Sequence, residues 1–146
     1  IIDTMNLVKP PVYVTSHGSI ASMASVITSC GEKGHRYILP GTRVMLHQAS
    51  SGAHGNIQDM EISLKETLAV NEALLEILAK NCGKTVEEMK NYTVRDYWLG
   101  AKEAKDFGLV DKILEAIQHP ETEVVEFKEA TSNYDFTKIG NYFSAF

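Results

Sequence analysis

The sequence predicts an α/β fold in which strands and helices alternate along the chain. Short apolar stretches typical of strands are interleaved with segments whose apolar residues recur at helical spacing. The chain has 146 residues, which suits one domain, and 44% of them are hydrophobic, which is ordinary for a globular protein. We therefore expect a layered domain in which helices pack on strands.

The first expected elements lie in the N-terminal part of the chain. Residues 1–8 have the spacing of one helix face, and the pattern stops at Pro10 because proline cannot continue a helix. Residues 12–15 have the pattern of a short buried strand, which ends at Gly18. Residues 22–29 are mostly small and apolar, which favours a buried helix after that turn.

The longest helical pattern lies in the middle of the chain. Two strands, 37–39 and 43–47, are expected around a Pro-Gly turn, and a polar, Gly-rich loop over 50–56 follows them. Residues 57–81 carry apolar side chains on two helix faces, and Gly83 is the expected end. Two apolar faces fit either a subunit interface or a helix in the centre of the core, and both alternatives stay open on the sequence.

The last expected elements are short. Thr85 and Glu88 have the spacing of a capping box, which predicts the start of a helix. After this helix we expect a loop over 91–99, a helix over 102–107 and a strand over 109–114.

The composition changes after Gln118. Residues 118–146 are rich in acidic side chains and hold half of the aromatic residues of the chain. Because a purely solvated tail is poor in aromatic residues, we expect this segment to dock, either on its own subunit or on a partner. The sequence thus predicts a folded domain over 1–117 and an acidic, aromatic-rich C-terminal tail over 118–146.

Composition also limits which binding partners and which cellular compartment we expect. The net charge of -5 argues against nucleic acid and against an anionic membrane, since both reward clustered Lys and Arg. No apolar run approaches the ~18 residues of a membrane-spanning helix. Cys30 and Cys82 are too few and too far apart for a disulfide framework, which favours a reducing compartment. The histidines form no metal-binding motif and the glycines no phosphate loop, so we expect no metal site.

Three residues are candidates for nucleophilic catalysis. Ser22 follows a strand and a glycine turn and begins a helix, where free amides and the helix dipole stabilise negative charge. The nucleophile-elbow motif is absent, because Ile20 and Ala24 occupy its glycine positions. Taken alone, Ser22 fits a helix cap, His47 an ordinary residue at a strand end and Asp96 a turn.

Together these residues belong to an ordered set of segments. The segments are GSIASMAS (18–25), RVMLHQ (43–48), DMEISLKETL (59–68) and VRDYWLGAKEAKDFGLVDKI (94–113). In order and spacing they resemble the proteolytic subunit of the Clp protease, whose serine motif is G-Q-A-A-S-M-G and whose histidine segment is R-x-M-I-H-Q. His47 lies 25 positions after Ser22, and Asp96 lies 49 positions after His47, which suits the family without an insertion. The likeness spans about residues 1–116.

The resemblance implies a fold and an activity. The implied fold is a ClpP/crotonase-like spiral of ββα units with a long handle helix, and the implied activity is that of a serine endopeptidase. Ser22 would attack the peptide carbonyl, His47 would take the hydroxyl proton, and Asp96 would hold the ring of His47. The backbone N–H of Met23 would donate to the oxyanion, and Arg95 would pair across rings.

The resemblance also implies partners. The family builds a tetradecamer of two stacked heptameric rings around a closed chamber, and a hexameric AAA+ ATPase of the Clp family feeds unfolded polypeptides into it. ATP is used by that partner, so no cofactor is expected in this chain. The implied location is the cytoplasm of a bacterium, or the stroma or matrix of an organelle.

The chain departs from the family pattern at several positions. Residues 19–20 and Ala24 differ from the family's serine motif, but these small changes should leave Ser22 able to act as a nucleophile. Val94 stands where the family often has an acidic residue. Family members have a helix and strands before the position of Ile1, and one of these strands supplies a second oxyanion amide. We expect this chain to be N-terminally short, either as a fragment or with an upstream piece supplied separately.

Two other functions stay open on the sequence. A structural ring subunit would assemble without cutting and would need no triad. A crotonase-type acyl-CoA enzyme shares the spiral layout and an amide oxyanion hole, but it would use carboxylates for acid–base chemistry and would not need Ser22.

Overall fold

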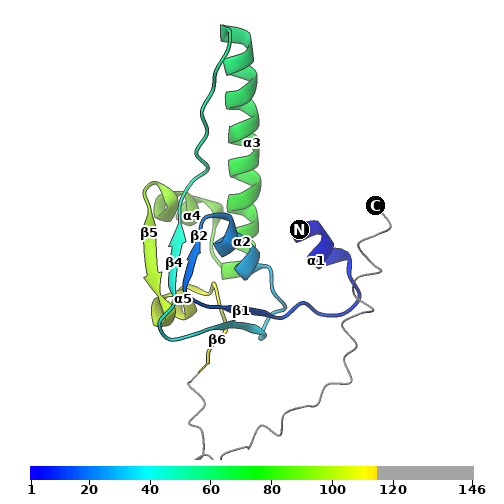
Figure 1. Ribbon diagram of the computed structural model, residues 1–146, viewed down its shortest axis with the longest axis vertical. Coiled ribbons are helices and arrows are strands. Elements are labelled where there is room, and N and C mark those ends of the chain that lie inside the picture. The colour runs from blue at the N-terminus through cyan, green and yellow to red at the C-terminus, as the bar shows by residue number, and fades with distance from the viewer. Residues whose placement is uncertain (115–146) are drawn as a thin grey trace, which may run out of the picture. The chain divides into compact units, whose positions relative to one another are not determined.

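The computed structural model describes residues 1–114, which belong to one compact unit, and the predicted tail over 118–146 lies outside the described residues. The helices of this unit are α1 (Ile2–Leu7), α2 (Met23–Ser29), α3 (Ile57–Cys82), α4 (Val86–Thr93) and α5 (Ala101–Phe107). Its strands are β1 (Val14–Ser16), β2 (Ser19–Ala21), β3 (Arg36–Ile38), β4 (Arg43–Leu46), β5 (Tyr97–Gly100) and β6 (Lys112–Ile113). The predicted alternation of strands and helices is therefore present (Figure 1).

The strands form two small sheets. One sheet has the order β1-β3-β6 and is parallel throughout; the other has the order β2-β4-β5. In the second sheet β2 runs parallel to β4, with Ala21 opposite Met45, while β5 runs antiparallel to β4, with Tyr97 opposite Leu46. The C-terminal ends of β2 and β4 and the N-terminal end of β5 consequently meet at one edge of this sheet.

The core lies between the sheets and the helices that cover them. Its largest fully buried apolar side chains are Ile38, Leu46, Met89, Leu109 and Val44. Val44 and Leu46 alternate with the half-buried Met45 along β4, which is the period expected of a strand with one face on a core. Burial of each such side chain contributes about 1.5–3 kcal/mol.

Helix α3 has two unlike halves. Asn56 caps its start by accepting a hydrogen bond from the Asp59 N–H, and Gly83, in the left-handed conformation, ends it. The buried residues, Leu75, Leu78, Ala79 and Cys82, all lie near its C-terminal end. The first half projects away from the sheets (Figure 1), and it exposes Ile57, Met60, Ile62, Leu64, Leu68 and Val70. The alternative of a helix in the centre of the core is therefore wrong for the first half of α3.

The observed secondary structure differs from the sequence-based expectations in three places. The predicted loop over 91–99 contains the last turn of α4 and most of β5, because residues 97–100 pair with β4. The predicted strand over 109–114 is reduced to β6, since the preceding residues leave α5 as a buried connection. Strand β2 was not expected, and it forms through its pairing with β4.

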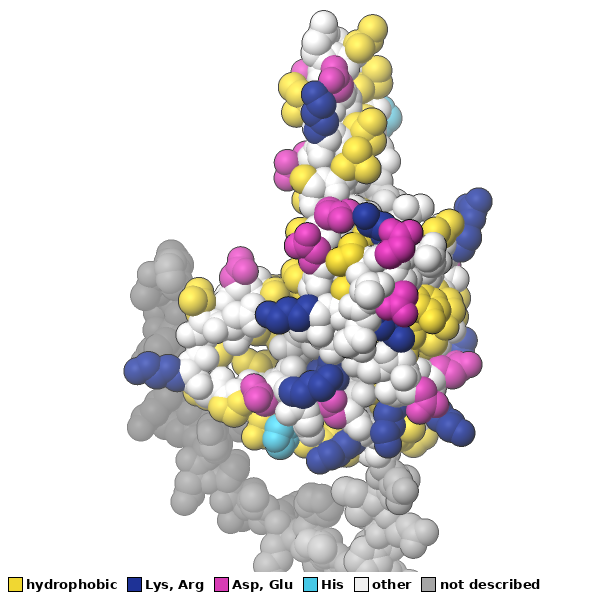
Figure 2. Space-filling view, turned by 180° about the vertical axis from the view of Figure 1, so that it is seen from behind, with side chains coloured by type: hydrophobic (Ala, Val, Ile, Leu, Met, Phe, Trp, Pro, Cys, Tyr) yellow, Lys and Arg dark blue, Asp and Glu magenta, His cyan; other side chains and the backbone are white. Residues whose placement is uncertain are grey.

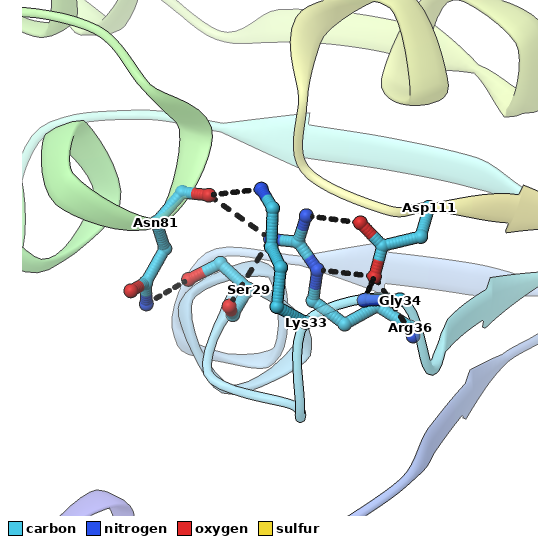
Figure 3. Close-up of polar contacts among 6 residues, drawn as sticks. All are labelled: Ser29, Lys33, Gly34, Arg36, Asn81 and Asp111. Carbon is cyan, nitrogen blue, oxygen red and sulfur yellow. Dashed lines mark hydrogen bonds and ion pairs between the residues drawn. The ribbon is translucent and has the colours of Figure 1, made fainter.

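A buried ion pair joins distant parts of this unit (Figure 3). Arg36 donates to Asp111 from Nη2 to Oδ1 (2.6 Å) and from Nε to Oδ2 (2.9 Å). Its Nη1 donates to the carbonyls of Asn81 (3.1 Å) and Ser29 (3.3 Å), and Asp111 also accepts from the Gly34 N–H (2.8 Å). The Arg36 hydrogen bonds lower the pKa of Asp111 from 3.8 to about 2. The pair thus ties together the C-terminal ends of α2 and α3, strand β3 and the start of β6.

Candidate active site

Ser22 occupies a strained turn between β2 and α2. Its backbone has φ 57° and ψ -124°, and within residues 1–114 it is the only non-glycine residue with a positive φ. Such a conformation costs roughly 1–3 kcal/mol and persists only where its surroundings enforce it. The turn leaves Ser22 exposed between strand and helix, although the glycines of the nucleophile-elbow motif are absent.

Neighbouring hydrogen bonds enforce this turn. The Ser22 N–H donates to the Met45 carbonyl (3.0 Å), which continues the pairing of β2 with β4 by one residue. The buried Ser25 hydroxyl donates to the same carbonyl (2.8 Å) and lies 3.1 Å from the Ile20 carbonyl. Ser25 therefore fastens the first turn of α2 to both strands, and this leaves the Ser22 side chain free of structural hydrogen bonds of its own.

His47 is the first residue after β4, and it meets Ser22 directly. Its Nε2 lies 2.7 Å from Ser22 Oγ, which is hydrogen-bond distance. The two side chains come together because β2 and β4 are parallel and end at the same edge of the sheet. With Nε2 unprotonated, His47 can accept the serine proton, which is the arrangement that a general base needs.

Asp96 lies on the other side of the His47 ring. Its Oδ1 is 3.7 Å from His47 Nδ1, which is beyond hydrogen-bond length, and its side chain is 62% exposed. It reaches this position because β5, which it precedes, is antiparallel to β4. In structures without substrate, catalytic hydrogen bonds are often longer than in the reacting complex, so this distance is compatible with a residue that orients His47.

The two remaining predicted site residues are Met23, at the start of α2, and Arg95, which is exposed after α4. Met23 is the first residue of α2, whose first intrahelical bonds run from the amides of Ser25 and Val26 to the Ser22 carbonyl. The Met23 amide therefore belongs to the helix-start amides that need an outside partner. Arg95 is exposed and forms no ion pair within residues 1–114, so the structure does not pair it with Asp96.

A cavity of about 240 Å³ opens next to Ser22 and His47. Apolar side chains from α2, β4 and α3 form much of its wall: Val26, Leu46, Leu74, Leu75 and Leu78. Ser22 and His47 therefore stand beside a pocket with an apolar part to its wall.

One residue of this pocket was not singled out by the sequence. Asn71 on α3 lines the cavity, and its Oδ1 accepts a hydrogen bond from the Ala49 N–H (2.8 Å). The sequence carries one signal for it: an amide side chain inside a helix whose neighbouring positions are mostly apolar. That signal does not reveal which backbone group the side chain meets.

The described residues contain neither a metal-binding cluster nor a membrane-spanning helix. Within residues 1–114, no three His, Cys, Asp or Glu side chains gather as they would around a metal ion. No helix in the same range is long and apolar enough to cross a membrane.

The part of the chain that matches a protein-family model includes the whole of this site. Residues 1–117 match the model of the family described as Clp protease, and this range includes Ser22, His47 and Asp96. The mixed α/β architecture, with parallel strand pairs and the long helix α3, is consistent with the ClpP fold. The match covers most of the chain, and the chain therefore belongs to the Clp protease family.

Proposed function

We propose that this chain is a serine endopeptidase subunit of a Clp-type protease, with Ser22 as nucleophile, His47 as general base and Asp96 as the residue that orients His47. The observation that carries the proposal is the 2.7 Å contact between His47 Nε2 and Ser22 Oγ on a strained strand-to-helix turn. Membership of the Clp protease family supports a peptidase over a crotonase-type acyl-CoA enzyme.

The proposed reaction follows from these positions. Ser22 Oγ attacks the peptide carbonyl carbon while its proton passes to His47 Nε2. The negative charge that develops on the carbonyl oxygen is stabilised by the Met23 amide at the start of α2. His47 then gives the proton to the leaving amine, and an acyl-enzyme on Ser22 remains. A water molecule, deprotonated by His47, hydrolyses this ester and restores the serine.

The cavity beside Ser22 indicates which side chains are preferred. Leu and Val side chains form one part of its wall, so an apolar side chain next to the scissile bond gains the free energy of leaving water there. A charged side chain would lose part of its hydration against these apolar groups. We therefore propose cleavage after apolar residues of unfolded polypeptides.

The projecting half of α3 supports self-association. Figure 2 shows hydrophobic side chains gathered along this part of the molecule, and Ile57, Ile62, Leu64 and Leu68 are each more than half exposed. An apolar surface of this kind on a folded chain commonly marks an interface. We propose that copies of the chain assemble through it into stacked heptameric rings, to which an AAA+ ATPase of the Clp family delivers substrates and which themselves use no ATP.

Peptide hydrolysis tests the proposal. With a fluorogenic peptide that has an apolar residue before the scissile bond, Ser22→Ala should lower kcat/KM by at least about 10⁴-fold. Ser19→Ala, in the same segment and exposed, is the matched control and should leave the rate unchanged. Hydrolysis that survives Ser22→Ala would refute the assignment of the nucleophile. Assembled wild-type rings that cut no peptide would favour a non-catalytic ring subunit instead.

A further inference from the structure

The chain leaves the sheet at His47, so contacts outside the sheet must hold this residue in place. β4 ends at Leu46, whose partner Tyr97 is the last paired residue of β5 on that side. Residues 50–56 are exposed. His47 therefore stands between a rigid strand and a solvent-exposed loop, and its ring position depends on the short segment 47–49.

Two anchors fix this segment, and they come from different helices. The Gln48 N–H donates to the Thr93 carbonyl at the end of α4 (3.0 Å), and the Gln48 side-chain amide lies 3.4 Å from the Val94 carbonyl. The Ala49 N–H donates to Asn71 Oδ1 on α3 (2.8 Å). The second anchor is the shortest of the three contacts and depends on a single side-chain atom.

Asn71 is an unusual residue for its place in the helix. It lies well inside α3, far from either cap, and asparagine is a weaker helix former than the Ala, Leu, Lys and Glu residues around it. It is half-buried in the wall of the cavity beside Ser22. There its oxygen accepts the hydrogen bond of the Ala49 N–H, which a hydrocarbon side chain could not do.

We infer that Asn71 is a positioning residue for His47: by fixing the Ala49 backbone it holds the imidazole at hydrogen-bond distance from Ser22. The inference rests on the proposed serine peptidase function. A displacement of about 1 Å at a reacting group can cost on the order of 10²-fold in rate, so an anchor two residues from the base has a measurable effect. The effect falls on kcat, because the His47 ring acts in the chemical step.

The first test removes the acceptor. Asn71→Leu keeps a side chain of similar size without the oxygen, and it should lower kcat and the rate of fluorophosphonate labelling by on the order of 10-fold, with KM changed by less than about twofold. Asn71→Asp keeps an oxygen at the acceptor position and should retain most of the activity. Asn91→Leu, the same substitution at an exposed position of α4, is the matched control and should behave as wild type.

The second test removes the donor. Ala49→Pro has no N–H and leaves Asn71 untouched, and it should reduce kcat as Asn71→Leu does. If both single variants act by breaking the same hydrogen bond, kcat of the double variant should be no lower than kcat of either single variant. Circular dichroism and native mass establish that each variant is folded and assembled; if Asn71→Leu is not, Ala49→Pro and Asn71→Asp decide the question.

The outcomes separate this inference from the proposed function. Wild-type protein that neither hydrolyses peptide nor reacts with the fluorophosphonate contradicts the peptidase itself. An active wild type with an unchanged kcat in Asn71→Leu contradicts only the positioning role. A raised KM with an unchanged kcat would make Asn71 a substrate contact, and additive losses in the double variant would show that the two groups act independently.

Discussion

Arg36–Asp111 and His47–Asp96 each pair a basic side chain with a carboxylate, and they are built in opposite ways. Arg36 is 1% exposed and meets Asp111 through two hydrogen bonds of 2.6 and 2.9 Å (Figure 3). His47 Nδ1 lies 3.7 Å from Asp96 Oδ1, and the Asp96 side chain is 62% exposed. The first pair is closed and buried, and the second is open to water.

The difference separates a pair that stabilises the fold from the pair that we propose for catalysis. A buried charge that loses its partner is strongly destabilising, so separating Arg36 from Asp111 should lower the free energy of unfolding. An exposed pair contributes little to stability, so His47 and Asp96 are not needed to hold the unit together. The first pair should therefore matter for unfolding and the second for rate.

Among substitutions in these two pairs, the largest effect is expected from Asp96→Asn on peptide hydrolysis. An amide cannot hold His47 in the required tautomer or stabilise its charged form, so kcat should fall by about 10³–10⁴-fold. Because Asp96 is exposed, the midpoint of thermal unfolding should not change. Asp106→Asn, at an exposed position of α5, is the matched control. Full activity in Asp96→Asn would remove Asp96 from the site.

The next largest effect is expected from Arg36→Met on stability. The substitution leaves the Asp111 carboxylate, which is 14% exposed, without its partner, and the free energy of unfolding in urea should fall by about 3 kcal/mol. Arg36→Met combined with Asp111→Asn should recover part of this loss, since no charge is then left unpaired and an oxygen remains for the Gly34 N–H. Lys65→Met, which breaks the exposed pair with Glu61, should cost less than about 1 kcal/mol. Equal losses from Arg36→Met and Lys65→Met would remove the distinction between buried and exposed pairs.

The smallest effect is expected in acid. The pKa of Asp111 is lowered from 3.8 to about 2, so its contribution is complete above pH 3.8 and is lost as the pH falls toward 2. The loss of unfolding free energy over this range should be about 2 kcal/mol. Urea unfolding of wild type and Asp111→Asn at several pH values measures it, because the variant lacks this titration. Parallel pH profiles for the two proteins would show that Asp111 is not the group responsible.

The sequence predicted the fold best where a pattern is local. The helix over 57–81 and the capping box at Thr85 follow from spacing along one segment, and the structure contains both. Strand β2 and most of β5 were missed, because their residues become strands only through pairing with β4. The apolar faces of residues 57–81 left two roles open, and only the burial of the C-terminal part of α3 separates them.

The candidate site shows the same division. Ser22, His47 and Asp96 could be predicted from ordered segments at fixed spacing, and the structure brings the first two into contact. The role of Asn71 could not be predicted, because its partner is a backbone amide 22 residues earlier in the chain. The same holds for Arg36 and Asp111, which are 75 residues apart.

Covalent labelling with a fluorophosphonate, located by mass spectrometry of the intact protein and its peptides, tests whether Ser22 is an activated nucleophile. The contact with His47 predicts one adduct per chain, on Ser22, and its absence in Ser22→Ala. His47→Ala should slow the labelling of a folded protein by several orders of magnitude, since no other base lies at hydrogen-bond distance from Ser22 Oγ within residues 1–114. An adduct that persists in Ser22→Ala, or that maps to another serine, would contradict the assignment of Ser22.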